Sequence, residues 1–420
     1  MKTKAVRLYG KMDLRLEEFE LPETGNDQIL ARIVSDSICL SSYKAAKQGE
    51  EHKRVPDNVS ENPVMIGHEF CGEIVSVGHK WQGSFEPGQK FSIQPALNYK
   101  GTLDAPGYSF PYTGGDATHI IIPNEVMEMN CLLNYQGDAF FMGSLSEPMS
   151  CIAGTFHAMY HTSPGRYEHT MGIVDGGTMA LLAGAGPMGL GTIDYAIHTD
   201  RKPRLLIVTD IDQARLDRVA SIYSPKEAKK NGVELIYVNT KGIDDVVSHL
   251  KSFNGGKGYD DVLVFASVRA VVEQADAILG RDGCLNFFAG PTDTEFSAEL
   301  NFYNVHYGST HVVGTSGGNT DDMIEALDLM ANGVLNPVAM ITHIGGLNAV
   351  VETTKHLMDI PGGKKLIYTN VDMELTAIDD FRKKGETNEF FKDLADIVET
   401  NNGLWSIAAE RYLMDHAEPI

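Results

Sequence analysis

The sequence predicts an α/β fold with two domains, a mostly-β domain first and a doubly wound parallel-sheet domain after it. The chain has 420 residues, more than one ordinary domain holds, so two domains are the default expectation. Its pattern also changes along the chain. Short strands broken by glycine and proline fill residues 1–147, whereas apolar strands alternate with helical stretches over 178–291. Such alternation is typical of a parallel sheet covered by helices.

The strands of the first domain are short and are bounded by turn residues. The clearest of them cover residues 4–10, 28–37, 71–78, 89–97 and 117–123. We therefore expect a mostly-β domain over residues 1–153.

The strands of the second domain are strongly apolar. They cover residues 178–186, 204–210, 235–240, 261–267 and 284–290. Helical spacing of apolar residues occurs between them, most clearly over residues 189–199, 212–221 and 270–280. This rhythm predicts a parallel, doubly wound sheet over residues 154–304.

Beyond residue 304 the pattern changes again. The glycine-rich turn GTSGGNT precedes an amphipathic helix whose Asp321 and Asp322 suit its first turn. We expect residues 305–370 to return to the first domain. Helical spacing after Asn370 then predicts a helical extension over 371–420, which should pack on the first domain or on a neighbouring subunit because its apolar stripes would be costly to expose.

Charge and composition exclude several classes of partner. With 35 basic and 57 acidic residues, the formal charge of -22 repels nucleic acid and anionic lipid. The start of the chain has no apolar run of a signal peptide, and no segment approaches the roughly 18 apolar residues that cross a bilayer. Five cysteines without a C-x-x-C pair argue against a disulfide framework. We expect a cytoplasmic protein that binds neither nucleic acid nor membrane.

A glycine-rich turn follows the first strand of the second domain. Gly184, Gly186 and Gly189 form G-x-G-x-x-G between an apolar strand and a helix, with Pro187 and Met188 inside the motif. Bare glycine backbone lets a dinucleotide pyrophosphate approach the helix N-terminus. The alternative is that the glycines only permit close packing of strand and helix. The context favours a dinucleotide-binding Rossmann domain.

An acidic residue lies where such a domain needs one. Asp210 ends the next strand, roughly 20 residues after the glycines, where a carboxylate can accept hydrogen bonds from the adenosine ribose. Arg215, one helical turn further, can assist the ribose or tolerate a 2′-phosphate. NAD is therefore favoured and NADP is the alternative, and we include Thr315 of the later glycine-rich turn in the predicted cofactor site.

Three segments upstream carry metal-ligand residue types. Cys39 in SICLSS, His68 in IGHEF and Glu147 in SEPMS offer a thiolate, an imidazole and a carboxylate. A catalytic zinc typically takes three such ligands and leaves a fourth position for water or substrate. Each residue also has an ordinary structural reading, as a buried cysteine, a hydrogen-bonded core histidine and a helix-start carboxylate.

The combination resembles the zinc-dependent medium-chain alcohol and polyol dehydrogenase family. The resemblance rests on IGHEFCGEIVSVG with C-x-S before it, E-P after it and the dinucleotide motif behind, and it covers most of residues 1–370. It implies a GroES-like catalytic domain with one zinc per subunit on Cys39, His68 and Glu147. It also implies Glu69 as an occasional or water-mediated ligand and Ser41 as the hydroxyl of the proton relay.

The chain departs from the family pattern in places. Leu40 replaces the usual glycine, and Ser42 replaces the acidic residue that orients the zinc-bound imidazole. No cysteine lies between Gln94 and Gly115, where many members hold a structural zinc. Residues 161–177 and the tail after residue 370 are additional.

The resemblance implies that zinc stabilises alkoxide character while hydride moves to or from the nicotinamide. The long, single-zinc form resembles the branch that interconverts L-sorbose 1-phosphate and sorbitol 6-phosphate, and it implies a homo-oligomer, a dimer or a tetramer. Three alternatives stay open: a zinc-dependent dehydrogenase of an unphosphorylated polyol, a zinc-free reductase of the same fold, and a dinucleotide-binding protein without turnover.

A sugar phosphate needs local cations on a chain of this charge. The segment YKAAKQGEEHKRVP, just after Cys39, offers Lys44, Lys47, Lys53 and Arg54, with His52 among them. Because Glu50 and Glu51 interrupt the basic residues, a solvated surface loop is an equally consistent interpretation.

Overall fold

The computed structural model describes residues 1–420 and divides into two compact units. Unit 1 comprises Met1–Pro148, Asn319–Ala331 and Val338–Ile420, and unit 2 comprises Met149–Gly318 and Asn332–Pro337. Unit 1 is mostly β with added helices and unit 2 contains a parallel sheet, so the predicted α/β class is confirmed. None of the helices combines the length and the apolar composition that crossing a membrane requires.

Unit 1 is built on two sheets. The smaller one has the order β2-β1-β4, with antiparallel pairing of β1 (Lys2–Gly10) to β2 (Asp13–Glu20) and to β4 (Val64–Met65). The larger one has the order β19-β17-β18-β3-β5-β6-β8, and β7 also pairs with β3. Its strands are β3 (Ile29–Ile38), β5 (Phe70–Val77), β6 (Lys90–Ile93), β7 (His119–Ile122), β8 (Leu132–Asn134), β17 (Ile341–Gly346), β18 (Lys364–Tyr368) and β19 (Thr376–Ala377).

The strands of unit 1 enclose apolar side chains that the alternating sequence pattern places on one face. Ile29, Ala31 and Ile33 of β3 are fully buried together with Phe70 and Phe91 from the neighbouring strands. The helices of this unit are α1 (Leu40–Gln48), α2 (Asn124–Glu128), α3 (Phe140–Ser144), α11 (Thr320–Ala331), α12 (Val350–Lys355), α13 (Phe381–Lys384), α14 (Glu389–Thr400) and α15 (Ile407–His416). Helix α4 (Ser146–Ala158) begins in unit 1 and continues in unit 2.

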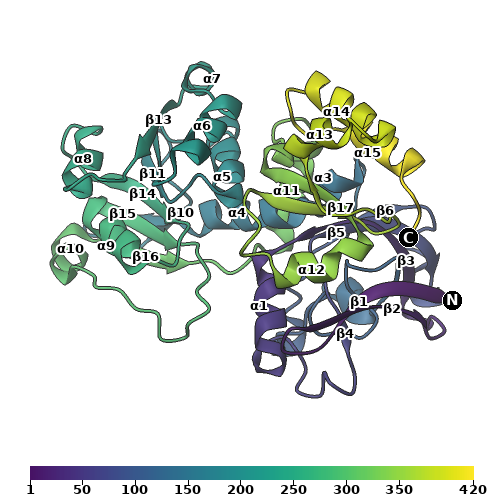
Figure 1. The fold of residues 1–420 in the computed structure, drawn as a ribbon. Coiled ribbons are helices and arrows are strands. Elements are labelled where there is room, and N and C mark those ends of the chain that lie inside the picture. Colours follow the sequence, from purple (N-terminus) through teal and green to yellow (C-terminus); the bar gives the residue numbers. More distant parts are fainter. The chain divides into compact units, whose positions relative to one another are not determined.

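The C-terminal extension belongs to unit 1. Figure 1 shows α13, α14 and α15 side by side, and the buried residues Leu394 and Val398 of α14 join one core cluster with Leu413 of α15. Trp405 between these helices is fully buried, and its ring packs against Tyr368 of β18 at a centroid distance of 6.1 Å. The apolar stripes seen in the sequence are therefore covered by the unit that carries the predicted zinc ligands.

Unit 2 contains a six-stranded parallel sheet with the order β13-β12-β11-β14-β15-β16. This is the strand order of dinucleotide-binding folds, in which ligands bind at the carboxyl ends of the strands near the reversal of order. The strands are β11 (Thr178–Leu182), β12 (Leu205–Asp210), β13 (Glu234–Asn239), β14 (Tyr259–Val264), β15 (Leu279–Phe287) and β16 (His311–Gly314). The helices around the sheet are α5 (Pro187–His198), α6 (Gln213–Ile222), α7 (Pro225–Lys230), α8 (Val246–Ser252), α9 (Arg269–Ile278) and α10 (Phe302–Gly308) (Figure 1).

Two segments differ from the sequence-based outline. Strand β16 extends the parallel sheet by pairing with β15, so the chain leaves unit 2 after Gly318 rather than at residue 304. The additional segment near residues 161–177 forms an antiparallel hairpin of β9 (Tyr160–Thr162) and β10 (His169–Met171). Asp282 anchors this hairpin, because its carboxylate accepts hydrogen bonds from the Thr162 amide and hydroxyl at 2.8 and 2.5 Å.

Candidate metal and dinucleotide sites

Three potential metal ligands from two segments meet in unit 1. Cys39 follows β3 directly and precedes α1, whereas His68 and Glu69 lie just before β5. One ligand atom from each side chain lies within 4.8 Å of the others. His68 and Glu69 are buried, at 4% and 1% exposure. Sulfur, nitrogen and oxygen donors in a buried group are a set that zinc accepts, so these residues fit the metal.

The backbone before His68 requires a glycine. Gly67 has a φ of +91°, and a Cβ built there would lie 2.0 Å from Oδ2 of Asp36 and 2.5 Å from the amide nitrogen of Asp116. Asp36 in turn accepts hydrogen bonds through Oδ1 from the amides of Ser37 and Glu69, at 2.7 and 3.1 Å. The motif glycine and a buried carboxyl thus fix the segment that carries two of the potential ligands.

The imidazole of His68 is held on both sides. Ser42 Oγ lies 3.3 Å from Nδ1, and Tyr108 Oη lies 3.1 Å from Nε2. Ser42 therefore occupies the position of the expected imidazole-orienting partner, with a hydroxyl in place of a carboxylate. Burial lowers the pKa of His68 to about 4, so the ring is neutral at pH 7 and keeps a lone pair for a metal.

Glu69 has a second buried partner. Lys364 of β18, which is 6% exposed, donates to Oε2 of Glu69 at 2.6 Å, and the Ser37 hydroxyl also donates to this carboxylate. Burial alone would raise the pKa of Glu69, but the Lys364 ammonium holds it below its ordinary value. The carboxylate is therefore ionised and already paired with a cation.

Cys39 and Glu147 complete the surroundings. Burial raises the pKa of the Cys39 thiol to about 12, and the charges of Glu69 and Glu147 act in the same direction. A coordinated metal cation would lower the pKa of the thiol again, since a metal deprotonates a thiol ligand. Glu147 lies in the first turn of α4 at 8% exposure, and it is not a member of the group of three whose ligand atoms lie within 4.8 Å.

Tyr108 connects the metal ligands to the basic segment. Its side chain is 2% exposed, its hydroxyl lies 3.1 Å from Nε2 of His68, and the Ser41 side chain is close enough to affect its pKa. The His52 ring stacks on it at 5.7 Å, and the Arg54 guanidinium lies 5.3 Å from the ring centroid. Sequence reasoning missed Tyr108, because its segment has no metal-ligand spacing and no glycine motif.

The predicted basic residues do not all lie in the same place. The charges of Lys44, Lys53 and Arg54 all act on His52, and together with its burial they lower its pKa to about 4. Lys47 Nζ instead lies 5.9 Å from the ring centroid of Tyr43. Three of the four predicted cations therefore cluster at His52, and Lys47 is not among them.

The glycine motif of unit 2 forms a tight turn between β11 and α5. A Cβ on Gly189 would lie 1.8 Å from the carbonyl oxygen of Gly184, so this position admits only glycine. Nothing lies within 4 Å of a Cβ built on Gly186, which leaves its backbone open to a ligand. Pro187 starts α5 at the first helical turn, where its missing N–H costs nothing, and Met188 follows it. This is the backbone that a pyrophosphate group needs.

The remaining predicted cofactor residues lie at or just beyond the carboxyl ends of the parallel strands, with Arg215 in the first turn of α6. Asp210 ends β12, and its Oδ1 accepts hydrogen bonds from the amides of Ile211 and Asp212 at 2.8 and 3.1 Å. Arg215 is exposed and lies 3.7 Å from Asp212. Thr315 follows β16, and its hydroxyl lies 2.9 Å from that of Thr155.

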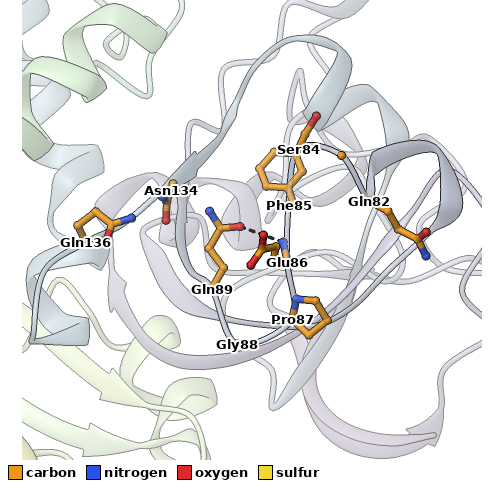
Figure 2. Close-up of a pocket in the computed structure, with 10 residues that line it drawn as sticks. Gln82, Ser84, Phe85, Glu86, Pro87, Gly88, Gln89, Asn134 and Gln136 are labelled. Carbon is orange, nitrogen blue, oxygen red and sulfur yellow. Dashed lines mark hydrogen bonds between the residues drawn. The ribbon is translucent and has the colours of Figure 1, made fainter.

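A polar depression occupies another part of unit 1. Figure 2 shows it between the loop that contains Ser84 to Gln89 and the chain at Asn134 and Gln136. Inside it the Glu86 amide donates a hydrogen bond to Gln89 Oε1 at 3.1 Å. None of the potential metal ligands lines it, so we assign it no part in the chemistry.

Two family models match the chain. Residues 25–130 match the model of the alcohol dehydrogenase GroES-like domain, and residues 187–332 match that of the zinc-binding dehydrogenases. The chain is 53% identical to mannitol-1-phosphate 5-dehydrogenase of Aliivibrio fischeri over 98% of its length and 97% of that protein. It is 50% identical to L-sorbose 1-phosphate reductase of Klebsiella pneumoniae over 100% of its length and 98% of that protein.

A solved structure shares the fold. The crystal structure of 2R,3R-butanediol dehydrogenase from Bacillus subtilis superimposes with a TM-score of 0.70 and 21% identity, covering 88% of this chain and 100% of that one. At this identity the likeness concerns the fold alone.

Proposed function

The chain belongs to the zinc-binding dehydrogenase family, and on that premise we propose that it interconverts a keto-sugar phosphate and the corresponding polyol phosphate. It is an oxidoreductase that acts on CH–OH groups, with zinc and NAD(P) as its cofactors. Two relatives that match nearly the whole chain are named for phosphorylated sugars, which supports a phosphorylated substrate. We take L-sorbose 1-phosphate and sorbitol 6-phosphate as the primary pair and mannitol 1-phosphate as the alternative.

The buried group around Cys39 and His68 carries the proposal. The Cys39 thiol and the neutral His68 imidazole lie together here, with the carboxylates of Glu69 and Glu147 near them. A thiolate, an imidazole and one carboxylate are a donor set of a catalytic zinc, which keeps one position open for substrate. When bound, zinc supplies Lewis-acid stabilisation of the negative charge that develops on the reacting oxygen. The two residues hold and orient the metal, and the Ser42 hydroxyl fixes the imidazole ring.

The proton travels through side chains of the protein. In the reductive direction bound NADH would supply the hydride for the keto carbon and leave as NAD⁺, while the Ser41 hydroxyl passes a proton to the oxygen. The Tyr108 hydroxyl, which lies near the Ser41 side chain, is the next group of the relay. In the oxidative direction the same groups accept the proton as the hydride leaves the carbinol carbon.

We infer that Glu147 completes the zinc ligand set and that Glu69 acts as an occasional or water-mediated ligand. The proximity of Glu69 to Cys39 and His68 favours the opposite assignment, but its carboxylate is already neutralised by Lys364. Metal analysis decides between them. We expect Glu147→Gln to lose most of its zinc and Glu69→Gln to retain it, and the reverse pattern would exchange their roles.

NAD is the cofactor that Asp210 favours. Its carboxylate, held by two backbone amides at the end of β12, can accept hydrogen bonds from ribose hydroxyls and repels a 2′-phosphate. Arg215 supports either form of the ribose.

We also infer that the chain forms a homo-oligomer through unit 2. Strand β16 is an open edge of the parallel sheet, and the adjoining helix α10 exposes Phe302, Tyr303 and Tyr307 at 74%, 69% and 66%. Aromatic side chains around an unpaired edge are costly to leave in water, and a second copy can pair with that edge across a two-fold axis. Sedimentation of Tyr303→Asp with Tyr307→Asp should show a monomer if this surface is the interface.

A substrate panel tests the proposed function. NADH oxidation is measured with L-sorbose 1-phosphate and with L-sorbose, and NAD⁺ reduction with sorbitol 6-phosphate, mannitol 1-phosphate and sorbitol. We expect kcat/KM for a phosphorylated substrate to exceed that for its unphosphorylated counterpart by at least about 100-fold. Equal values would favour an unphosphorylated polyol, and no turnover of any of them would refute the proposal.

A further inference from the structure

The basic segment beside the metal ligands contains a guanidinium with unused hydrogen-bonding capacity. Nε of Arg54 is buried and has no hydrogen-bond partner, and Arg54 takes part in no ion pair. Its backbone is tied down, since its carbonyl accepts a hydrogen bond from Ser109 Oγ at 2.7 Å and its amide donates to His52 Nδ1 at 3.3 Å. A buried donor without a partner is unfavourable unless a ligand supplies the acceptor.

The guanidinium is held in place by aromatic stacking. It lies over the ring of Tyr108, whose hydroxyl is 3.1 Å from His68 Nε2. A group bound by Arg54 therefore lies one tyrosine ring away from a predicted zinc ligand. Arginine suits this position, because its planar fork stacks on an aromatic face and still presents two N–H groups to an anion.

Neighbouring charges make the same place attractive to an anion. The charges of Lys44, Lys53 and Arg54 all lower the pKa of His52, and the charge of Arg54 also lowers that of His68. Lys53 is exposed and, like Arg54, forms no ion pair. Such a cluster of positive charge on a chain with a net charge of -22 is unfavourable without an anionic ligand.

The acidic residues of the segment form no ion pair with Lys53 or Arg54. Glu51, which made a solvated surface loop an equally consistent interpretation of the sequence, pairs with Lys11 at 2.5 Å instead of with Lys53 or Arg54. Lys47, which is exposed, lies over the ring of Tyr43 instead. The segment therefore has a surface part, in which Glu51 is paired with Lys11, and a second part in which Lys53 and Arg54 form no ion pair and Arg54 lies over Tyr108.

We propose that Arg54 binds the phosphate group of the substrate, with Lys53 as a second ligand and Lys44 contributing to the positive field. This inference rests on the proposed function, because it assigns the phosphate subsite of that reaction. The chemical class is a phosphomonoester dianion on a keto-sugar or polyol. Arg54 is the main phosphate ligand because one guanidinium can form two parallel hydrogen bonds to phosphate oxygens.

Kinetics with paired substrates test the subsite. Arg54→Gln should lower kcat/KM for the sugar phosphate by about 10- to 100-fold, the loss expected for charge-assisted hydrogen bonds, while changing that for the unphosphorylated sugar less than about twofold. Arg54→Lys keeps the charge but loses the fork, so it should recover part of the activity. Arg15→Gln is a matched control, because Arg15 also stacks on a tyrosine, Tyr9, at 4.1 Å and lies outside the cluster.

A binding measurement gives a second readout. Calorimetric titration of wild-type protein with sorbitol 6-phosphate should give a dissociation constant that Arg54→Gln raises by the same factor, whereas Arg15→Gln leaves it unchanged. An equal loss for phosphorylated and unphosphorylated sugars would overturn the assignment. So would a raised KM for NADH with an unchanged KM for the sugar phosphate, which would assign the cation to the dinucleotide.

The failure of this inference can be told from failure of the proposed function. If wild-type protein turns over no sugar phosphate, the proposed function fails whatever Arg54→Gln does. If wild-type protein prefers the sugar phosphate and Arg54→Gln keeps that preference, only the phosphate subsite is wrong.

Discussion

Glu410 in the C-terminal extension stabilises the start of the helical segment that leads to Glu147. Its carboxylate is 2% exposed and accepts hydrogen bonds from the amides of Phe140 and Phe141 at 2.8 and 2.9 Å and from the Tyr368 hydroxyl at 2.9 Å. The two amides belong to the first turn of α3, where helix N–H groups lack partners within the helix. A carboxylate there satisfies both and also favours the helix dipole.

Glu410→Ala should destabilise unit 1 by about 3–5 kcal/mol. Each hydrogen bond to a charged acceptor contributes about 1.5–3 kcal/mol, and the buried amides are left without partners. The energy of desolvating the carboxylate offsets part of the sum, and this cost is visible in the pKa of Glu410, which burial raises above its ordinary value. Glu410→Gln keeps one acceptor oxygen and should cost about 1–2 kcal/mol.

Urea unfolding followed by tryptophan fluorescence measures this loss. Both tryptophans, Trp81 and Trp405, lie in unit 1, and Trp405 donates to the same Tyr368 hydroxyl at 2.8 Å. The control is Glu399→Ala, because Glu399 is 62% exposed and pairs with Arg382, so its loss should change stability by less than about 1 kcal/mol. An unfolding midpoint of Glu410→Ala equal to that of wild type would refute the reasoning.

Further predictions concern the cofactor and the buried acids. Asp210→Ala should weaken NAD binding more than NADP binding, and an unchanged ratio of their dissociation constants would show that another residue sets the preference. Gly189→Ala should abolish NADH binding or unfold unit 2, because its Cβ would meet the Gly184 carbonyl oxygen at 1.8 Å, and NADH fluorescence titration with circular dichroism measures both. Burial raises the pKa of Asp116 from 3.8 to about 7, so the folded chain holds a proton that the unfolded chain has lost between those values. Stability should therefore fall as pH rises from about 4 to about 7 and level off above, and Asp116→Asn should flatten that slope in urea titrations at about pH 5 and pH 8; an unchanged slope would contradict it.

Local patterns predicted much of the fold. Strands β1, β3, β5, β6 and β7, strands β11 to β15, and helices α5, α6 and α9 follow from apolar periodicity and turn residues, since these signals act within a few residues. Strands β2, β4, β8, β17, β18 and β19 were not predicted. Strand β16 was harder to place, because its membership of the parallel sheet depends on pairing with β15 and not on its own four residues. The hairpin β9–β10 likewise depends on a distant anchor, Asp282.

In the candidate site, too, residues in local motifs could be predicted and residues brought in by distant contacts could not. Cys39, His68, Gly184 and Asp210 stand in motifs whose spacing carries chemical meaning. Lys364 does not, because it reaches Glu69 from 295 residues away along the chain.

Partners within the basic segment also escape sequence reasoning. Glu51 lies beside Lys53 and Arg54 in the sequence, yet in the folded chain it forms an ion pair with Lys11. Tyr108 connects this segment to His68 through ring contacts that no spacing rule encodes. Contacts of this kind arise from tertiary packing.

The most direct test of the central claim is the dependence of turnover on zinc at the Cys39–His68 site. Purified protein is assayed for NAD⁺ reduction with sorbitol 6-phosphate and for zinc content, then again after chelation and after stepwise return of zinc. We predict that turnover disappears with the metal and returns in proportion to zinc up to one per chain, and that Cys39→Ala binds NADH yet recovers neither zinc nor turnover. Full turnover by zinc-depleted protein, or by Cys39→Ala, would contradict the account.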